Sequence, residues 1–114
     1  MKKSIMLKKN YEFKYLLSKG KFYYGKYFHI YIKETNLNFN KFGIAISKKS
    51  GKAVKRNHIK RLIRENYKNF ESKIKTGVDI LIVINKNINI EEVTFKQIED
   101  NFLNIFNKAG LMEN

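Results

Sequence analysis

The stretch 78–84, VDILIVI, is apolar at every position except Asp79. A strand with one solvated face alternates apolar and polar residues, whereas a near-continuous apolar run is typical of a strand covered on both faces. We therefore predict a central strand at 78–84, in a sheet with helices packed against it.

The segment 21–34 alternates with period two and predicts further strands, with a turn or bulge at Gly25. Its apolar residues Phe28, Ile30 and Ile32 fall on one face. Another strand is predicted at 42–47. The face opposite the apolar one carries Tyr27, His29, Tyr31 and Lys33.

Helix signals separate and flank these strands. A first helix is predicted at 10–18, capped by Asn10. A second is predicted at about 53–70, and a last one begins at the capping-box pair Thr94 and Gln97. The order α-β-β-β-α-β-α predicts an α+β sandwich with a four-stranded sheet.

The composition narrows the class of protein. A chain of 114 residues predicts one domain, 1–114, and the absence of cysteine excludes disulfides and thiolate sites. The longest apolar run is too short to cross a bilayer, so we expect no membrane partner beyond peripheral contact. The net charge of +14 favours nucleic acid as the partner, with an anionic membrane or simple solubility as alternatives.

The segment 47–65, SKKSGKAVKRNHIKRLIRE, concentrates this charge. Between Lys48 and Arg64 it contains eight basic residues and no acid. At about 100° per residue, a helix here has one apolar stripe and an opposite ridge. An ordinary exposed helix face would mix both signs, so the ridge predicts RNA or DNA binding. The only arginines of the chain, Arg56, Arg61 and Arg64, all lie in this segment, and a guanidinium suits phosphate.

A second candidate surface is the outward face of the strand at 27–33. Aromatic rings interleaved with cations, as in Tyr27, His29, Tyr31 and Lys33, stack unpaired bases and hold a phosphate backbone. The alternative is that strands simply favour tyrosine and that a helix covers this face.

Nothing in the sequence predicts a self-sufficient catalyst. The two histidines, His29 and His58, cannot be brought together from sequence, and the acids are scattered. No metal-ligand spacing is present, so we expect no catalytic residue, no bound cofactor and no metal in this chain.

The same basic segment resembles the ribonuclease P protein family. The family's basic helix, an Arg-Asn-Arg motif followed by Ile-Lys-Arg and a further Arg, here reads RNHIKRLIR over 56–64. The stretches SKKSGKAV (47–54) and LKKN (7–10), with Phe13, also match the family pattern in register.

The resemblance implies an RNA partner that holds the catalytic centre, requires Mg²⁺, and cuts the 5′ leader from precursor tRNA. It also implies a left-handed βαβ crossover, a cytoplasmic location and a protein that is monomeric when free. Contacts to the catalytic RNA are expected from Lys48, Lys49, Lys52, Lys55, Arg56, Asn57, His58, Lys60, Arg61 and Arg64. Contacts to the leader are expected from Phe13, Leu17, Tyr27, His29, Tyr31 and Lys33.

Two positions depart from the family pattern. His58 replaces the second Arg of the motif, and Leu17 stands where an aromatic is common. The competing hypotheses are a ribosomal-type RNA-binding module without a cleavage role, a stand-alone nuclease and a DNA-binding module. The last would need a helix that reads bases, whereas this ridge favours phosphates.

Overall fold

A five-stranded mixed sheet forms the middle layer of the protein, with the order β1-β4-β5-β3-β2. The computed structural model describes residues 4–113. The central strand is β5 (Val78–Ile84), as the apolar run predicts. It pairs in parallel with β4 and antiparallel with β3, and the short β1 and β2 lie at the edges. The other strands are β1 (Ser4–Met6), β2 (Lys21–Tyr23), β3 (Phe28–Glu34) and β4 (Asn40–Ala45).

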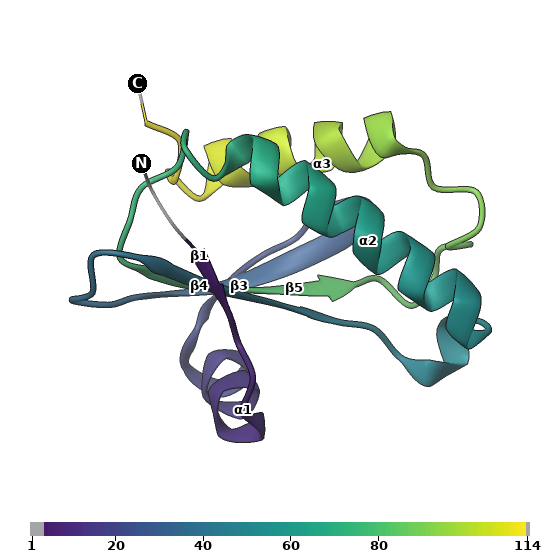
Figure 1. The fold of residues 1–114 in the computed structure, drawn as a ribbon, viewed down its shortest axis with the longest axis horizontal. Coiled ribbons are helices and arrows are strands. Elements are labelled where there is room, and N and C mark those ends of the chain that lie inside the picture. Colours follow the sequence, from purple (N-terminus) through teal and green to yellow (C-terminus); the bar gives the residue numbers. More distant parts are fainter. Residues whose placement is uncertain (1–3, 114) are drawn as a thin grey trace.

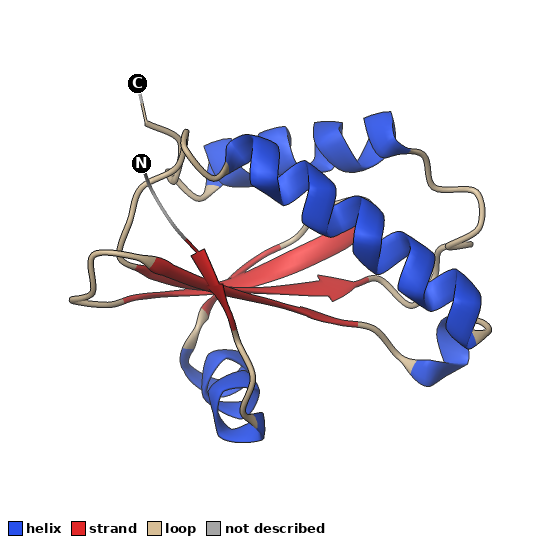
Figure 2. Ribbon diagram, viewed as in Figure 1, coloured by secondary structure: helices blue, strands red, loops and turns tan. Residues whose placement is uncertain are grey.

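Helices cover both faces of this sheet (Figures 1 and 2). The helices α2 (Ala53–Phe70) and α3 (Phe95–Lys108) pack side by side on one face. The helix α1 (Asn10–Lys19) lies alone on the other, below the sheet in Figure 1. A 3₁₀ turn, η1 (Lys48–Ser50), connects β4 to α2.

The main core lies between the sheet and the α2–α3 layer. Phe28, Ile30 and Ile32 of β3 are buried in it, which confirms the predicted alternation of that strand. Tyr67 of α2 stacks on Phe42 of β4 with ring centroids 4.1 Å apart. Burial raises the pKa of Tyr67 to about 12, although its hydroxyl lies 2.8 Å from Ser4 Oγ, a hydrogen bond that lowers it.

A smaller core lies under α1. It consists of Leu7, Leu16 and Leu81, with Phe13 packed against it. Gly43 of β4 makes this approach possible, because a Cβ there would lie 3.0 Å from Phe13 Cε1. The α1 helix therefore lies over β3 and β5, beside Gly43 of β4.

The strand register aligns residues of β3, β5 and β4 in three rows across the α1 face of the sheet. The first row is His29, Val83 and Ala45; the second is Tyr31, Leu81 and Gly43; the third is Lys33, Asp79 and Lys41. The first row lies at the end of the sheet from which β4 leads into η1 and α2.

The ends of α2 and α3 follow the sequence signals. The bounds of α2 are those predicted, and Thr94 caps α3 by accepting a hydrogen bond from Gln97 N at 3.2 Å. The chain turns after α3 at Gly110, whose φ of +70° suits glycine.

Three details of the predicted fold were wrong. The sheet has five strands, because the unpredicted β1 pairs in parallel with β4. The fourth strand is Asn40–Ala45 rather than 42–47, since the buried Asn40 already belongs to it and donates to Lys75 O. The cap residue of α1 is Lys9 rather than Asn10, because Lys9 N donates to Glu12 Oε1 at 3.1 Å.

No helix within residues 4–113 combines the length and the apolar character needed to span a bilayer.

Candidate nucleic-acid interface

Basic residues crowd the beginning of α2. Ser47 caps the η1 turn by accepting a hydrogen bond from Lys49 N at 3.2 Å, and Lys52 is the N-cap of α2. The first turn of α2 contains no acid, and the Lys52 side chain makes no capping hydrogen bond to any residue of the described chain. The partial positive charge of a helix start disfavours cations, so this arrangement lacks the usual local stabilisation.

The exposed side of α2 forms what we call the cationic ridge. Its inner face, Ile59, Ile63, Tyr67 and Phe70, is buried against the sheet and α3. Residues four positions apart align along a helix, so Arg56, Lys60 and Arg64 form one partly exposed row. The cationic ridge consists of Lys52, Arg56, Asn57, Lys60, Arg61, Arg64 and Lys68.

Few acids neutralise this ridge. Arg61 forms an exposed ion pair with Glu65, with Nε and Oε1 4.0 Å apart, and such pairs contribute little. Within residues 4–113, neither Lys60 nor Arg64 forms an ion pair, and the buried Nε of Arg56 has no hydrogen-bond partner. The guanidinium groups therefore remain available to a phosphate-bearing partner.

The structure places Lys55 and His58 on the other flank of α2. There they line a hollow with Val54, Ile90 and Glu91, and Lys55 Nζ lies 4.0 Å from Glu91 Oε1. His58 is exposed but does not join the Arg56 row. Lys48 and Lys49 lie on the exposed η1 turn, beside the start of the ridge.

A cluster of three rings lies on the α1 face of the sheet, towards its β2 edge. The ring centroid of Phe22 on β2 lies 5.0 Å from that of His29 and 5.3 Å from that of Tyr31. The His29 and Tyr31 centroids are 5.7 Å apart. Phe22 is 47% exposed, so its ring is available for stacking. The three rings are called the aromatic cluster below.

Hydrogen bonds fix the orientation of His29. Asn85 Nδ2 donates to the carbonyl oxygens of Gly25 and Lys26, at 2.8 and 2.9 Å. Asn85 Oδ1 is therefore the acceptor for His29 Nδ1, 2.7 Å away. Neutral His29 carries its proton on Nδ1, which leaves Nε2 as an acceptor, and protonation adds an Nε2–H donor.

Of the other residues predicted to contact the leader, Phe13 and Leu17 lie on α1 beside this face, whereas Tyr27 and Lys33 lie outside the aromatic cluster. Phe13 is half-buried under α1, and Leu17 is 50% exposed on α1. Lys33 is exposed at the end of β3 farthest from η1. Tyr27 precedes β3 and packs towards α3, where its backbone N–H donates to Asn101 Oδ1 at 2.7 Å, so it does not join the aromatic cluster.

Sequence reasoning missed Phe22. The strand β2 has only three residues, which is too short for an alternation to assign faces. The available signal was the turn at Gly25, which folds β2 back onto β3 and pairs Phe22 with Tyr31.

The carboxylates of Glu12 and Asp79 lie on the α1 face of the sheet, beside Lys41 of the third row. Glu12 Oε2 lies 3.3 Å from Lys41 Nζ, and the backbone N–H of Lys9 is the main cause that lowers the pKa of Glu12. Burial raises the pKa of Asp79, against the opposing effect of Lys41. Within residues 4–113, no three His, Asp or Glu side chains gather as metal ligands.

Comparison with known proteins decides the family. A family model described as Ribonuclease P matches residues 1–110. The chain is 38% identical over 112 residues to the ribonuclease P protein component of Alkaliphilus metalliredigens, across 98% of this chain and 99% of that protein. The chain belongs to the ribonuclease P protein family.

Three further ribonuclease P proteins are similar to this chain over most of its length. The Clostridium botulinum protein component is 36% identical over 106 residues, across 92% of this chain and 94% of that protein. The Staphylococcus aureus RNase P protein structure superposes with a TM-score of 0.84, at 31% identity, and the match covers 97% of this chain and all of that one. The Thermotoga maritima RNase P protein gives 0.82 at 26% identity, covering 96% and 98%.

As a ribonuclease P protein, the chain is a subunit of the endoribonuclease holoenzyme and acts in the maturation of tRNA 5′ ends. Membership of the family implies association with ribonuclease P RNA. The ribosomal-type module considered from sequence is thereby set aside.

Proposed function

We propose that the chain acts as one RNA-binding domain with two working surfaces. The cationic ridge and the η1 lysines bind the catalytic RNA, and the aromatic cluster holds the 5′ leader of precursor tRNA. The observation that carries this proposal is the single-sign ridge, whose Arg56, Lys60 and Arg64 have no acidic partner within residues 4–113. A protein that gained only solubility from these charges would place acids among them.

The chemistry itself belongs to the RNA subunit, and the protein contributes charge and position. Two RNAs repel each other through their phosphates, and the cations of the ridge lower that repulsion when protein and RNA combine. Holding the leader fixes the scissile phosphate relative to the RNA's catalytic groups, which is a proximity contribution.

The aromatic cluster supports the leader contact. Stacking on Phe22 and Tyr31 requires unpaired bases, and a leader is single-stranded where the mature tRNA body is paired. The fixed His29 ring adds a polar edge whose donor and acceptor are set by Asn85. Phe13 and Leu17 border the same face from α1.

Four further points belong to this proposal. The holoenzyme requires Mg²⁺, which we assign to the RNA rather than to side chains of this chain. The free protein is monomeric and acts in the cytoplasm, two points whose support is the family resemblance. The crossover from β4 through α2 to β5 is left-handed, as the family resemblance implies. The parallel pairing of β4 and β5 requires such a crossover over one face of the sheet but does not fix its hand.

The leader contact is tested by replacing the rings. Phe22→Ala and Tyr31→Ala should each weaken binding of precursor tRNA to the holoenzyme by roughly tenfold, because base stacking on a ring contributes about 1–3 kcal/mol. Binding of mature tRNA should not change. The matched control is Phe95→Ala, which removes a partly exposed ring on α3. Equal losses for precursor and mature tRNA would contradict the leader contact.

A further inference from the structure

A small hollow lies between the start of α2 and the loop that leads from β5 to α3. Val54, Lys55 and His58 line it from α2, and Ile90 and Glu91 line it from the loop. Its volume is about 290 Å³, near the lower end of the range of roughly 300–1,000 Å³ that is usual for ligand pockets. A hollow of this size suits one planar ring rather than a larger ligand.

The hollow presents apolar surface beside the cationic ridge. The Val54 side chain is 75% exposed in the first turn of α2, whereas Ile90 is 3% exposed and belongs to the main core. Valine at this position adds little to the helix, because β-branched residues are weaker helix formers and this one buries little surface. Asn57 of the ridge and His58 of the hollow follow Val54 by three and four positions, so both adjoin it. A partner that lies on the ridge therefore meets this apolar surface.

Hydrogen bonds and close packing hold the backbone around the hollow in place. Glu91 N donates to Asn89 Oδ1 at 3.1 Å, and Glu92 N donates to Asn89 O at 3.1 Å. On the η1 side, Gly51 comes so close to Ile90 that a Cβ at position 51 would lie 3.2 Å from Ile90 Cδ1. The η1 turn, α2 and the β5–α3 loop therefore meet at one fixed place.

The carboxylate in the hollow is unexpected beside a surface that binds phosphates. Among the described residues that line the hollow, Glu91 is the only acid. Its side chain is 56% exposed, and its ion pair with Lys55, at 4.0 Å, is of the exposed kind that contributes little. An acid at this position repels the RNA backbone, unless a base donates hydrogen bonds to it. Because an ionised carboxylate only accepts, it selects base edges that present N–H groups.

We propose that this hollow binds an unpaired guanine of the catalytic RNA. Guanine presents two adjacent donors, N1–H and N2–H, on its Watson–Crick edge, and the two oxygens of Glu91 accept them. Val54, Ile90 and the His58 ring contact the base itself, while the cations of the ridge contact the neighbouring phosphates. This inference rests on the proposed binding of the catalytic RNA by the ridge and adds a base-specific contact to it.

The first test is Glu91→Gln, for which two physical effects predict opposite signs. Loss of an acid makes the chain more positive, so general attraction to phosphates predicts tighter binding of ribonuclease P RNA. The proposed contact predicts weaker binding, by roughly tenfold, because glutamine replaces one accepting oxygen with an N–H donor and breaks a bidentate base contact.

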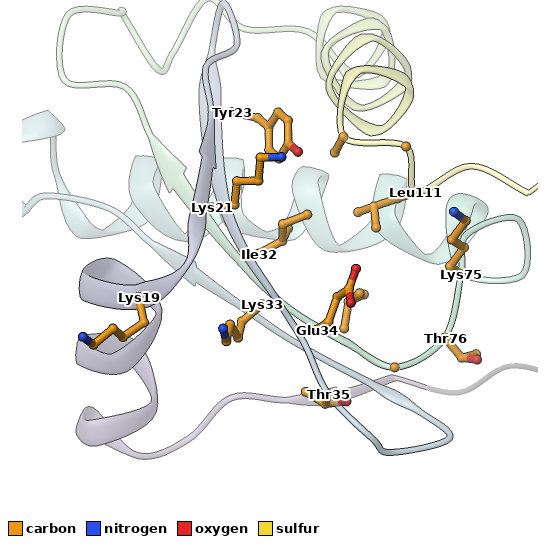
Figure 3. A pocket seen from close by; sticks show the side chains of 14 residues that line it. Lys19, Lys21, Tyr23, Ile32, Lys33, Glu34, Thr35, Lys75, Thr76 and Leu111 are labelled. Atoms are coloured by element: carbon orange, nitrogen blue, oxygen red, sulfur yellow. The ribbon is translucent and has the colours of Figure 1, made fainter.

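The matched control for this variant is Glu34→Gln. Figure 3 shows Glu34 in a separate hollow at the opposite end of the sheet from η1, among lysines that come from several segments. The control makes the same change of charge away from the proposed guanine site. It should bind ribonuclease P RNA as tightly as the wild type or more tightly.

The second test is Val54→Ser, which removes apolar contact without a change of charge. Binding of ribonuclease P RNA should weaken roughly threefold, and the slope of log K against log salt should stay at the wild-type value, because no phosphate contact is lost. Leu37→Ser, at an exposed position in the β3–β4 loop, is the matched control and should change neither quantity. Thermal unfolding of all four variants checks that they fold alike.

Chemical probing of the RNA identifies the base. A reagent that modifies N1 and N2 of unpaired guanines should leave one guanine unmodified when saturating wild-type protein is bound. The same guanine should stay protected by Glu34→Gln and become reactive with Glu91→Gln, also at saturating protein.

Three results would overturn the inference. One is unchanged or tighter binding by Glu91→Gln, another is an unchanged affinity or a lower salt slope for Val54→Ser, and the third is that no guanine depends on Glu91 for its protection. Failure of the ridge itself looks different, because Arg61→Gln with Arg64→Gln would then bind ribonuclease P RNA as the wild type does.

Discussion

Arg61 and Arg64 contribute little to the fold, and their proposed role is in binding RNA. The side chain of Arg61 is 63% exposed and forms an ion pair with Glu65, while Arg64 has no ion pair within residues 4–113. Neither side chain belongs to the buried core. Their contribution to the stability of the free protein is therefore small.

We predict that Arg61→Gln with Arg64→Gln weakens binding to ribonuclease P RNA and flattens its dependence on salt. Each phosphate contact that is lost should reduce the slope of log K against log salt by about one. A salt titration of binding measures this, with Lys96→Gln and Lys108→Gln on α3 as the control. An unchanged slope would show that the ridge does not contact phosphates.

Tyr67 gives a pH-dependent prediction at the same scale. Its pKa is raised to about 12 by burial, so the folded protein holds this proton more tightly than the unfolded chain, whose value is near 10. The stabilisation is complete below about pH 10 and is lost as pH rises towards 12, by about 2 kcal/mol. Denaturant unfolding should show this decline in the wild type. The decline should be smaller in Tyr67→Phe; equal pH dependence in both proteins would contradict this role.

The sequence predicted the positions of some residues of the candidate site correctly and of others incorrectly. His29 and Tyr31 were predicted on one face because β3 is long enough to alternate. Tyr27 was placed with them, but the strand begins at Phe28, and hydrogen bonds to Asn101 turn the preceding backbone towards α3. That pairing joins residues more than 70 positions apart, so no local pattern reveals it.

At the scale of elements, α2 carries a conflict between folding and binding. Its N-cap is Lys52, its first turn has no acid, and Lys55 and Arg56 lie against the positive end of the helix. Serine or aspartate at this position and acids in the first turn would stabilise the helix. The basic start of α2 therefore lowers the stability of the free protein, a cost that the proposed contact with RNA would offset.

We predict that Lys52→Asp raises the free energy of unfolding by about 1 kcal/mol, through an N-cap hydrogen bond and a favourable charge at the helix start. The same change should weaken binding to ribonuclease P RNA. Thermal unfolding and a binding titration measure the two effects, with Lys52→Gln as the variant that removes charge without a strong cap. A variant that is both less stable and unchanged in affinity would show that Lys52 serves the fold.

Elements with strong local signals were predicted with their bounds. The apolar run of β5 and the amphipathic pattern of α2 each correspond to a single element with the same ends. The strand β1 was missed because its three residues are stabilised by parallel pairing with β4, a contact between distant segments. The start of β4 was missed because Asn40, a polar residue, is buried and donates to Lys75 O.

At the scale of the whole molecule, the described residues gather basic groups on the surface while acids and histidines stay apart. No three acids or histidines gather as metal ligands within residues 4–113. The ridge lies on the α2–α3 side of the sheet, and the aromatic cluster lies on its α1 face. This arrangement suits a protein that positions one RNA against another.

The central claim is that this chain enables cleavage by an RNA and does not cleave by itself. The most direct test is cleavage of precursor tRNA at low Mg²⁺, with the protein alone, ribonuclease P RNA alone, and the two combined. Because the protein lowers the repulsion between the RNAs, we predict cleavage only in the combined reaction. Removal of the leader by the protein alone would contradict the claim.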